Sequence, residues 1–263
     1  MSKVGRYSAI ILEIFRRHYQ NDVDIFEFDR SEIEEVAQTL EIKLPKNIGD
    51  VLYSFRFRKD LPQEITSTAP GGLEWIIELA GYGNYKFRLS QINRINPNVN
   101  LVYIKIPDST PEIITKYALN DEQALLAKVR YNRLIDIFLG ITTYSLQNHL
   151  RTTVPKIGQI EIDEIYVGIN RNGTQFVIPV QAKGGEDKLG IVQTKQDIAC
   201  CNEKFPQLVC RPVSAQFMDD NVIVLFELAI QEEQIKVVEE KHYKLVLADA
   251  ISDEELSNYK KRE

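Results

Sequence analysis

The chain has 263 residues, 44% of them hydrophobic, which is enough for the core of one large domain or two smaller ones. Its net charge of −6 excludes a globally basic nucleic-acid binder, although a DNA enzyme can gather positive charge on one surface. Cys200, Cys201 and Cys210 have no zinc-type spacing with the histidines, so we expect reduced thiols in the core. There is no signal peptide and no apolar run of membrane length, so we expect a soluble cytoplasmic protein without a membrane partner.

The first elements alternate helix and strand. Residues 7–19 have amphipathic helical spacing, and Phe26-Glu27-Phe28 predicts a short strand. Ser31 followed by Glu34 has the spacing of a capping box, which predicts a second helix that reaches about Leu40.

A third helix and a hairpin complete this region. Pro45 favours a helix start, and the helix is expected to run from Lys46 to about Phe57. Alternating runs at 73–79 and 84–89, joined by Gly81-Tyr82-Gly83, predict a β-hairpin. The order of elements over about residues 5–90 resembles a winged helix-turn-helix, which implies a third helix in the DNA major groove and a wing over the backbone.

The third helix and its exit carry side chains that can bond bases or phosphates. The candidate DNA contacts here are Lys46, Asn47, Tyr53, Arg56, Arg58 and Lys59. Two alternatives stay open: the basic residues can form a solvated surface turn, and winged helices also serve as protein-protein modules.

A domain junction is expected near residues 107–111, where two prolines and turn-forming residues interrupt both periodicities, after one possible strand at 92–106. This divides the chain into a recognition domain, 1–110, and a second domain, 111–263. The second domain is expected to begin with a long helix from Glu122 to about Leu139, in which Glu122 shares a face with apolar residues.

Residues 144–151 are interpreted as another helical piece, and residues 188–205 as a later helix. Polar side chains on these segments are candidate phosphate or base contacts: Gln147, Asn148, His149, Arg151, Gln193 and Lys195. Apolar strands are expected at 208–215 and 222–228. The charge-rich segment 232–244 suggests no function, and the chain from Val246 onward is expected to be helical or frayed.

The most informative stretch is 158–185. Two β-branched apolar runs flank Asn170-Arg171-Asn172-Gly173, which predicts a β-hairpin. Position 172 is midway between Asp163 and Gln181, so these residues should lie opposite one another to within a residue or so. Because side chains alternate along a strand, Glu161, Asp163, Gln181 and Lys183 should project into one small volume, with Glu164 pointing away.

Carboxylate and amide oxygens suit Mg²⁺, and a lysine beside them can act on an attacking water or on phosphate oxygens. The arrangement resembles the PD-(D/E)XK nuclease superfamily of restriction endonucleases. Asp163 matches its first acid and Lys183 its lysine, whereas Gln181 stands where the family usually has Asp or Glu, and Ile162 replaces its Pro. The alternative without a functional site is that these polar side chains form an ordinary solvated face of a sheet.

The resemblance implies an α+β fold with αβββαβ order over about residues 116–230. It implies a Mg²⁺-dependent endonuclease that cuts double-stranded DNA at a specific sequence, as a twofold homodimer. Asp163, Gln181, Lys183 and Glu122 would be catalytic, and the metal ligands would be Asp163, Gln181, the Ala182 carbonyl and Glu161. Two alternatives are an inactive sequence-specific DNA-binding regulator, suggested by the neutral Gln181, and a nuclease for branched or modified DNA.

Overall fold

The computed structural model describes residues 5–57, 59–92, 95–117, 122–155, 157–184, 190–232 and 234–261. It is a mixed α+β protein with two compact units. The first unit comprises residues 1–94, 151–160 and 190–199, and the second comprises 95–150, 161–189 and 200–263. In this part of the chain, no helix is long and apolar enough to cross a membrane.

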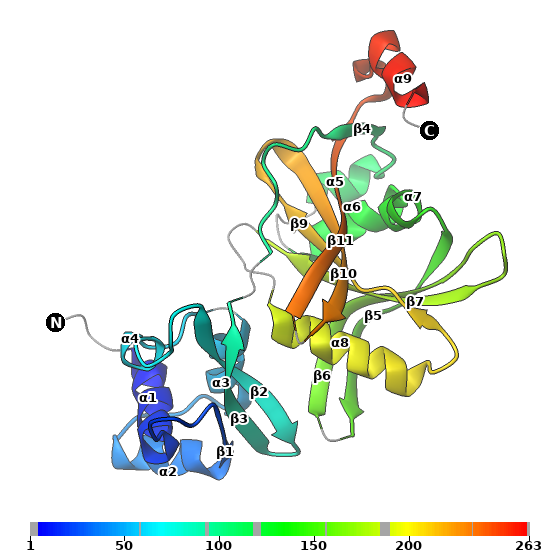
Figure 1. The fold of residues 1–263 in the computed structure, drawn as a ribbon. Helices are drawn as coiled ribbons and strands as arrows, with labels where there is room; N and C mark the ends of the chain where they lie inside the picture. The colour runs from blue at the N-terminus through cyan, green and yellow to red at the C-terminus, as the bar shows by residue number, and fades with distance from the viewer. Residues whose placement is uncertain are drawn as a thin grey trace. The chain divides into compact units, whose positions relative to one another are not determined.

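The first unit has helices and a three-stranded antiparallel sheet with strand order β1-β3-β2 (Figure 1). Its elements are α1 (Arg6–His18), β1 (Ile25–Asp29), α2 (Ser31–Thr39), α3 (Gly49–Phe57), α4 (Gln63–Thr66), β2 (Leu73–Gly81) and β3 (Asn84–Gln91). The predicted hairpin is present, and the positive φ angles of Gly81 and Gly83 make its tight turn possible. The pairing of β1 with β3 was not predicted from the sequence and extends the hairpin to three strands.

Two helix starts differ from their predictions because other side chains cap them. Asp29, not Ser31, accepts the first hydrogen bond of α2, from the Ser31 N–H, while Glu32 accepts from the Asp29 N–H. The predicted capping box is therefore wrong by two positions. Helix α3 begins at Gly49 rather than at residue 46, because the Asn47 side chain accepts from the Gly49 N–H.

An aromatic cluster forms the core of the first unit. Phe87 is fully buried, and its ring lies 5.2 Å from Phe15, 5.2 Å from Phe26 and 5.4 Å from Phe28 between centroids. Trp75, the single tryptophan of the chain, packs edge-on against the same ring at 6.4 Å. Burial of this cluster joins α1 to all three strands.

The second unit contains an eight-stranded sheet of order β4-β11-β10-β9-β7-β6-β5, with β8 paired to β7. The strands are β4 (Ile104–Pro107), β5 (Thr142–Val154), β6 (Gly158–Ile169), β7 (Gln175–Lys183), β8 (Val209–Cys210), β9 (Val213–Phe217), β10 (Val222–Gln231) and β11 (Gln234–Val246). The helices are α5 (Glu112–Tyr117), α6 (Glu122–Tyr131), α7 (Leu134–Leu139), α9 (Asp253–Lys260) and the end of α8 (Ile191–Lys204). Residues 191–199 of α8, 151–154 of β5 and 158–160 of β6 belong to the first unit. The short 3-10 helices are η1 (Asp219–Asn221) and η2 (Ala248–Ala250).

Helices cover both faces of this sheet. Helices α6 and α7 pack on one face, where they meet Ile178, Val180 and Ala182 of β7. On the other face, Cys201 of α8 packs against Ile165 and Val177. Along the chain the order is α6, α7, β5, β6, β7, α8, the two-residue β8 and β9, and both β8 and β9 run parallel to β7. The two helical layers explain why β7 is buried along almost its whole length.

Two predictions for this region are wrong. The long helix is broken into α6 and α7 because Arg133 adopts a left-handed conformation, with φ 51°. The segment 144–151 is not helical but forms the centre of strand β5, next to β6 at the end of the sheet. Its local polarity suggested a helix, but pairing with β6 decides its structure.

The remaining segments join the sheet or its margins. The charge-rich tail forms β11, which pairs with β10, and β4 adds to it in parallel. The last part of the chain forms α9, which a capping box of Ser252 and Glu255 begins. All three cysteines are free, and Cys200 and Cys201 are buried, as expected. The first unit's leading segment ends at residue 94, whereas the sequence suggested a junction at 107–111.

We expect Phe87→Ala to destabilise the first unit by about 3–5 kcal/mol, because the change leaves a cavity among four aromatic rings. Urea denaturation followed by Trp75 fluorescence reports on this unit alone, since Trp75 is the single tryptophan. The control is Tyr82→Ala in the exposed hairpin turn, where the side chain is 97% exposed and the change should be small. Equal effects of the two substitutions would contradict the assigned core.

Candidate functional site

The β6–β7 hairpin has the register that the sequence predicts. Strand pairing runs from Ile169 opposite Gln175 to Glu164 opposite Val180, so Asp163 and Gln181 are the next two residues along the strands. The turn is fixed by Asn170, whose Oδ1 accepts from the backbone N–H groups of Asn172 and Thr174. Gly173 follows with φ 81°, a conformation that glycine adopts without strain.

Asp163, Gln181 and Lys183 lie on one face of the sheet. Val180 and Ala182 of β7 pack on α6 and α7, so Gln181 and Lys183 alternate to the opposite face. Asp163 is two residues from Ile165, which packs on that same opposite face with Val177 and α8. Gln181 and Lys183 are almost completely buried, at 2% and 8% exposure. The predicted co-placement of these side chains is therefore present.

The Asp163 carboxylate is held in place but poorly stabilised as an anion. Its Oδ2 accepts a 2.9 Å hydrogen bond from the Ala182 N–H. Burial raises the pKa of Asp163 above its usual range, although this hydrogen bond and the positive charge of Lys183 act in the opposite direction. A buried carboxylate of this kind gains from a nearby cation.

Glu161 and His149 border this carboxylate. Glu161 adds negative charge that raises the pKa of Asp163, and His149 acts to lower it. The His149 Nδ1 lies 3.4 Å from the Glu161 Oε1, and the side chain is about half exposed. His149 has φ 48° inside strand β5, a left-handed conformation that is strained for a residue other than glycine. From the sequence we expected Glu161 to bind the metal and His149 to contact DNA. Nothing in the sequence indicated that the two side chains would lie next to each other.

The oxygen donors at this site fit Mg²⁺. Asp163 supplies a carboxylate, Gln181 an amide oxygen and Ala182 a backbone carbonyl, with Glu161 next to them. Mg²⁺ usually takes only one or two protein carboxylates and keeps several waters. Within the described ranges, no three His, Cys, Asp or Glu residues form a group that could hold an ion. A site here would depend on amide and carbonyl oxygens and on water as well as on Asp163.

Glu122 is not brought to this face. It is the first residue of α6, and α6 packs on the side of the sheet opposite to Asp163. Its position follows from the buried stripe of Leu125, Leu126 and Val129, which directs the helix onto Ala182 and its neighbours. The structure therefore does not support the prediction that Glu122 joins the metal site.

The candidate DNA contacts of the first unit lie in different environments. Lys46 and Lys59 are exposed, and Tyr53 is 41% exposed and packs against the Phe57 ring. Asn47 hydrogen-bonds to Asp50 and caps α3. The Arg56 guanidinium is largely buried, which lowers its pKa to about 10. Arg58 lies outside the described residues.

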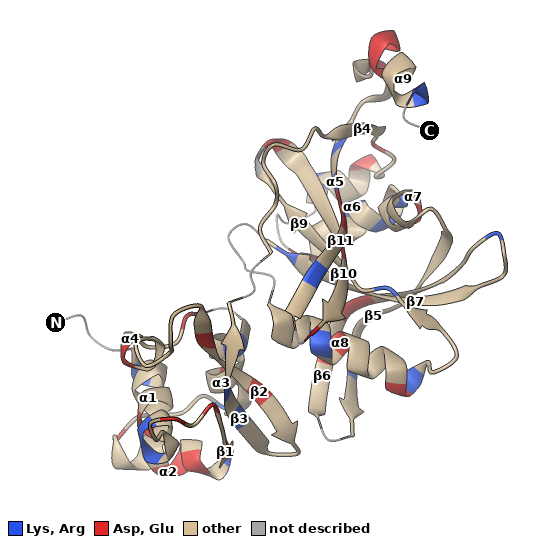
Figure 2. Ribbon diagram, in the orientation of Figure 1, with Lys and Arg blue, Asp and Glu red and all other residues tan. Residues whose placement is uncertain are grey.

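The candidate DNA contacts on β5 and α8 also differ in their exposure. Gln147, Asn148, His149 and Arg151 are exposed on strand β5, and the Asn148 Oδ1 accepts from Arg130. Gln193 and Lys195 are half-buried on α8, where the Lys195 charge helps to lower the pKa of Glu78 despite burial of that carboxyl. Lys and Arg residues are spread over both units among acidic residues (Figure 2).

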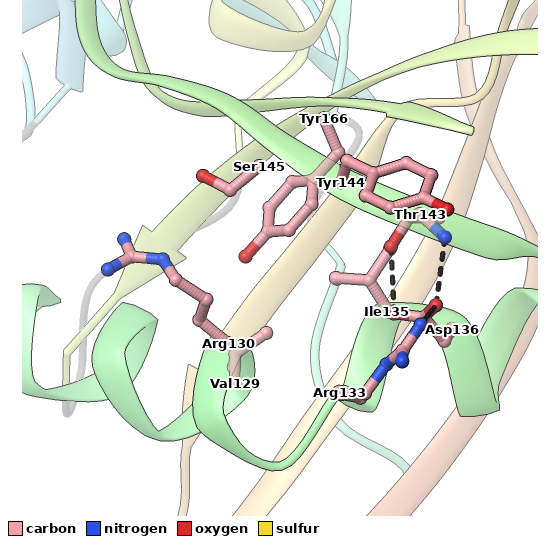
Figure 3. Close-up of a pocket in the computed structure, with 9 residues that line it drawn as sticks. All are labelled: Val129, Arg130, Arg133, Ile135, Asp136, Thr143, Tyr144, Ser145 and Tyr166. Atoms are coloured by element: carbon pink, nitrogen blue, oxygen red, sulfur yellow. Dashed lines mark hydrogen bonds and ion pairs between the residues drawn. The ribbon is translucent and has the colours of Figure 1, made fainter.

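Sequence reasoning missed a buried ion pair behind the hairpin. Glu164 is completely buried, and its Oε1 accepts from Arg130 Nε at 2.8 Å and from Ser145 Oγ at 2.6 Å. Arg130 and Ser145, the two partners of Glu164, also line a cavity (Figure 3). The signal was present in the sequence, because Glu164 interrupts the apolar face formed by Ile162 and Tyr166, and a buried carboxylate needs a partner.

Comparisons with known proteins give no relative: no protein-family model, curated protein or solved structure matches the chain.

We expect Asp163→Asn to raise the free energy of unfolding at neutral pH when no metal is present. Burial raises the folded-state pKa above 3.8, the ordinary value, so the ionised carboxylate destabilises the folded protein. As the pH falls through the folded-state pKa, the wild-type carboxyl takes up a proton, and the gain from Asn should shrink. Urea denaturation of both proteins from neutral to acidic pH measures this.

Asp108→Asn is the control, in which the free energy of unfolding should change in the opposite direction. Burial acts to raise the pKa of Asp108, but hydrogen bonds from Thr110 and Asn132 outweigh it, so the pKa is lowered. This substitution should lower stability at neutral pH, and the loss should disappear in acid. Shifts of the same sign in the two variants would contradict the burial account of Asp163.

Proposed function

We propose that this protein is a Mg²⁺-dependent endonuclease that hydrolyses phosphodiester bonds in double-stranded DNA at a specific sequence, as type II restriction enzymes do. The observation that carries the proposal is the buried Asp163 carboxylate, which shares one face with Gln181 and Lys183. Apart from the two-residue β8 between α8 and β9, the order α6–α7, β5, β6, β7, α8, β9, with β9 parallel to β7, agrees with the αβββαβ order of the PD-(D/E)XK superfamily.

The roles of the residues follow from their chemistry. Asp163, Gln181 and the Ala182 carbonyl would hold the ion, with Glu161 reached through water. With Mg²⁺ bound at these oxygens, the site would gain a cation that orients the phosphate and acidifies a water. Among the groups that most affect the pKa of Asp163, Lys183 is the one amine. It would orient the attacking water or contact the phosphate oxygens.

Sequence recognition would come from the first unit. Its element order and its β1-β3-β2 sheet agree with a winged helix-turn-helix, which supports a role for α3 in the major groove. The exposed Lys46, Tyr53 and Lys59 remain the best candidates on this helix and its flanks, whereas the burial of Arg56 argues against a direct contact. Two cuts in a duplex need two sites, so we infer a twofold homodimer on a palindromic target.

A second candidate is a DNA-binding regulator without catalytic activity. The neutral Gln181, buried where the superfamily usually has an acid, favours it. It predicts sequence-specific binding that Mg²⁺ does not alter. A nuclease for branched or modified DNA is the third reading, and linear, branched and methylated substrates would separate it from the first.

Lys183→Ala should reduce cleavage of plasmid DNA in Mg²⁺ by at least about 100-fold, the effect expected when a proton-transfer or orienting group is lost. Gel shift in Ca²⁺ should show that DNA binding is kept. Lys236→Ala, on the exposed side of β11, is the matched control and should cut normally. If Lys183→Ala cuts as fast as wild type, the assigned site is wrong.

Mg²⁺ should stabilise the protein in the absence of DNA. At a free concentration 100 times its Kd, binding adds about 2.7 kcal/mol to the free energy of unfolding. Asp163→Asn should lose most of this gain, because it removes the carboxylate that would contact the ion directly. Thermal denaturation with and without Mg²⁺ measures it, with the exposed Asp249→Asn as control. Equal Mg²⁺ stabilisation of all three proteins would place the ion elsewhere.

A further inference from the structure

Strand β5 forms one edge of the sheet in the second unit, and its middle part is open to solvent. Within the residues that the structure describes, the sheet order gives this strand one neighbour, β6. Residues 144–149 are exposed one after another, so neither face of the strand is covered there. From 142 to 148 the strand contains no charged residue and no proline, two of the features with which natural proteins block an edge.

The opposite edge of the same sheet is blocked. Strand β4 has four residues and ends at Pro107, which has no N–H to donate. The N–H of Lys105 donates to the Tyr259 hydroxyl of α9, and the Lys105 ammonium forms an ion pair with Glu255 of the same helix. Helix α9 therefore occupies a backbone donor that another strand would need. Two copies of the chain that pair through sheet edges must then join β5 to β5, which is a closed twofold arrangement.

The backbone groups of β5 that point outward can be assigned. Residues 155–157 join β5 to β6, and so short a connection makes the two strands antiparallel. The N–H of Thr143 donates to the Asp136 carboxylate at 2.8 Å and so points away from β6 (Figure 3). Because the backbone groups of alternate residues point to the same side, those of Ser145 and Gln147 also point away from β6. His149, the next such position, has φ 48° and departs from strand geometry.

We propose that β5 pairs antiparallel with β5 of a second copy of this chain, about a twofold axis at Leu146. In this register Ser145 of each copy lies opposite Gln147 of the other, and each such pair exchanges two backbone hydrogen bonds. An axis at Ser145 would instead place Gln147 opposite Thr143, whose N–H is already bonded to a carboxylate. An axis at Gln147 would place Ser145 opposite His149, where the backbone is left-handed.

The side chains of this segment are compatible with a copy of themselves. The two Leu146 side chains, each 51% exposed, would face each other at the axis. Tyr144, which is 63% exposed, would lie diagonal to Leu146 of the second copy. No like charges would meet, because residues 142–148 carry none. The pairing names an interface for the twofold homodimer of the proposed function, and its role in a double cut rests on that function, whereas the pairing itself needs no catalytic activity.

Sedimentation equilibrium of the full chain over a range of concentrations tests the pairing. Wild type should form a dimer that dissociates on dilution. Gln147→Pro removes an outward N–H from each copy and should weaken dimerisation by about tenfold or more, whereas the monomer should keep its fold, which circular dichroism checks. Gln147→Thr keeps the N–H and is the matched control, so it should dimerise like wild type.

Two results of this experiment would overturn the proposal. One is wild-type protein that stays monomeric up to about 100 µM, which would leave the open edge to a strand from a different protein. The other is folded Gln147→Pro protein that dimerises as tightly as wild type, which would place the dimer interface on another surface.

Cysteine cross-linking tests the register. Opposite residues at a non-hydrogen-bonded antiparallel position have Cα atoms about 4.5 Å apart, within the disulfide range of about 4.4–6.8 Å. Leu146→Cys should therefore form a disulfide between two copies in mild oxidant, visible as a dimer band on a non-reducing gel. Val238→Cys, at a position 59% exposed on β11, is the control, and wild type reports on the native cysteines. If Leu146→Cys cross-links no faster than Val238→Cys, the proposed axis is wrong.

Both experiments are done in EDTA without DNA, so their results do not depend on whether the protein cuts DNA. A dimer with the proposed register that does not cut would refute the nuclease proposal alone. An active nuclease that dimerises through another surface would refute this interface alone.

Discussion

The register of the β6–β7 hairpin is the constraint on which the second unit depends. Asn170 accepts two backbone hydrogen bonds within the turn, and Gly173 supplies the positive φ that completes it. A slip of one residue would exchange the two faces of each strand. Lys183 would then enter the apolar layer beneath α6, and Ala182 would take its place beside Asp163. The short polar turn therefore controls where the charged groups of both strands lie.

Two neighbouring acids on β6 show how much the face matters. Glu164 is buried against α6, with Arg130 and Ser145 as hydrogen-bond partners. Asp163 faces the other way, and burial raises its pKa even though Lys183 lies near it. Glu164 has the partners of a structural ion pair. The ionised form of Asp163 is destabilised by burial, and a bound cation would stabilise it. Adjacent residues of one type thus acquire different chemistry from their surroundings.

Local reasoning failed where pairing with a distant segment decides the structure. The polar residues from 144 to 151 suggested a helix, but the segment lies beside β6 in the sheet and becomes a strand. The charged tail likewise becomes β11 because β10 presents an open edge. The break between α6 and α7 at Arg133 was also not predicted, although Asn132, a common turn residue, immediately precedes it. In each case the competing local preference is weak, and burial or pairing outweighs it.

The sequence by itself determined the mixed α+β class, the hairpins with their glycine turns, and the alignment of Asp163 with Gln181 and Lys183. These features follow from side-chain alternation and turn chemistry, which act between residues close in the chain. Only the tertiary structure decided that Glu122 lies across the sheet from Asp163, that Arg56 is buried, and that His149 contacts Glu161. It also formed the cavity that residues of α6, α7, β5 and β6 line. Those outcomes depend on which faces pack together, and no spacing within the chain specifies that.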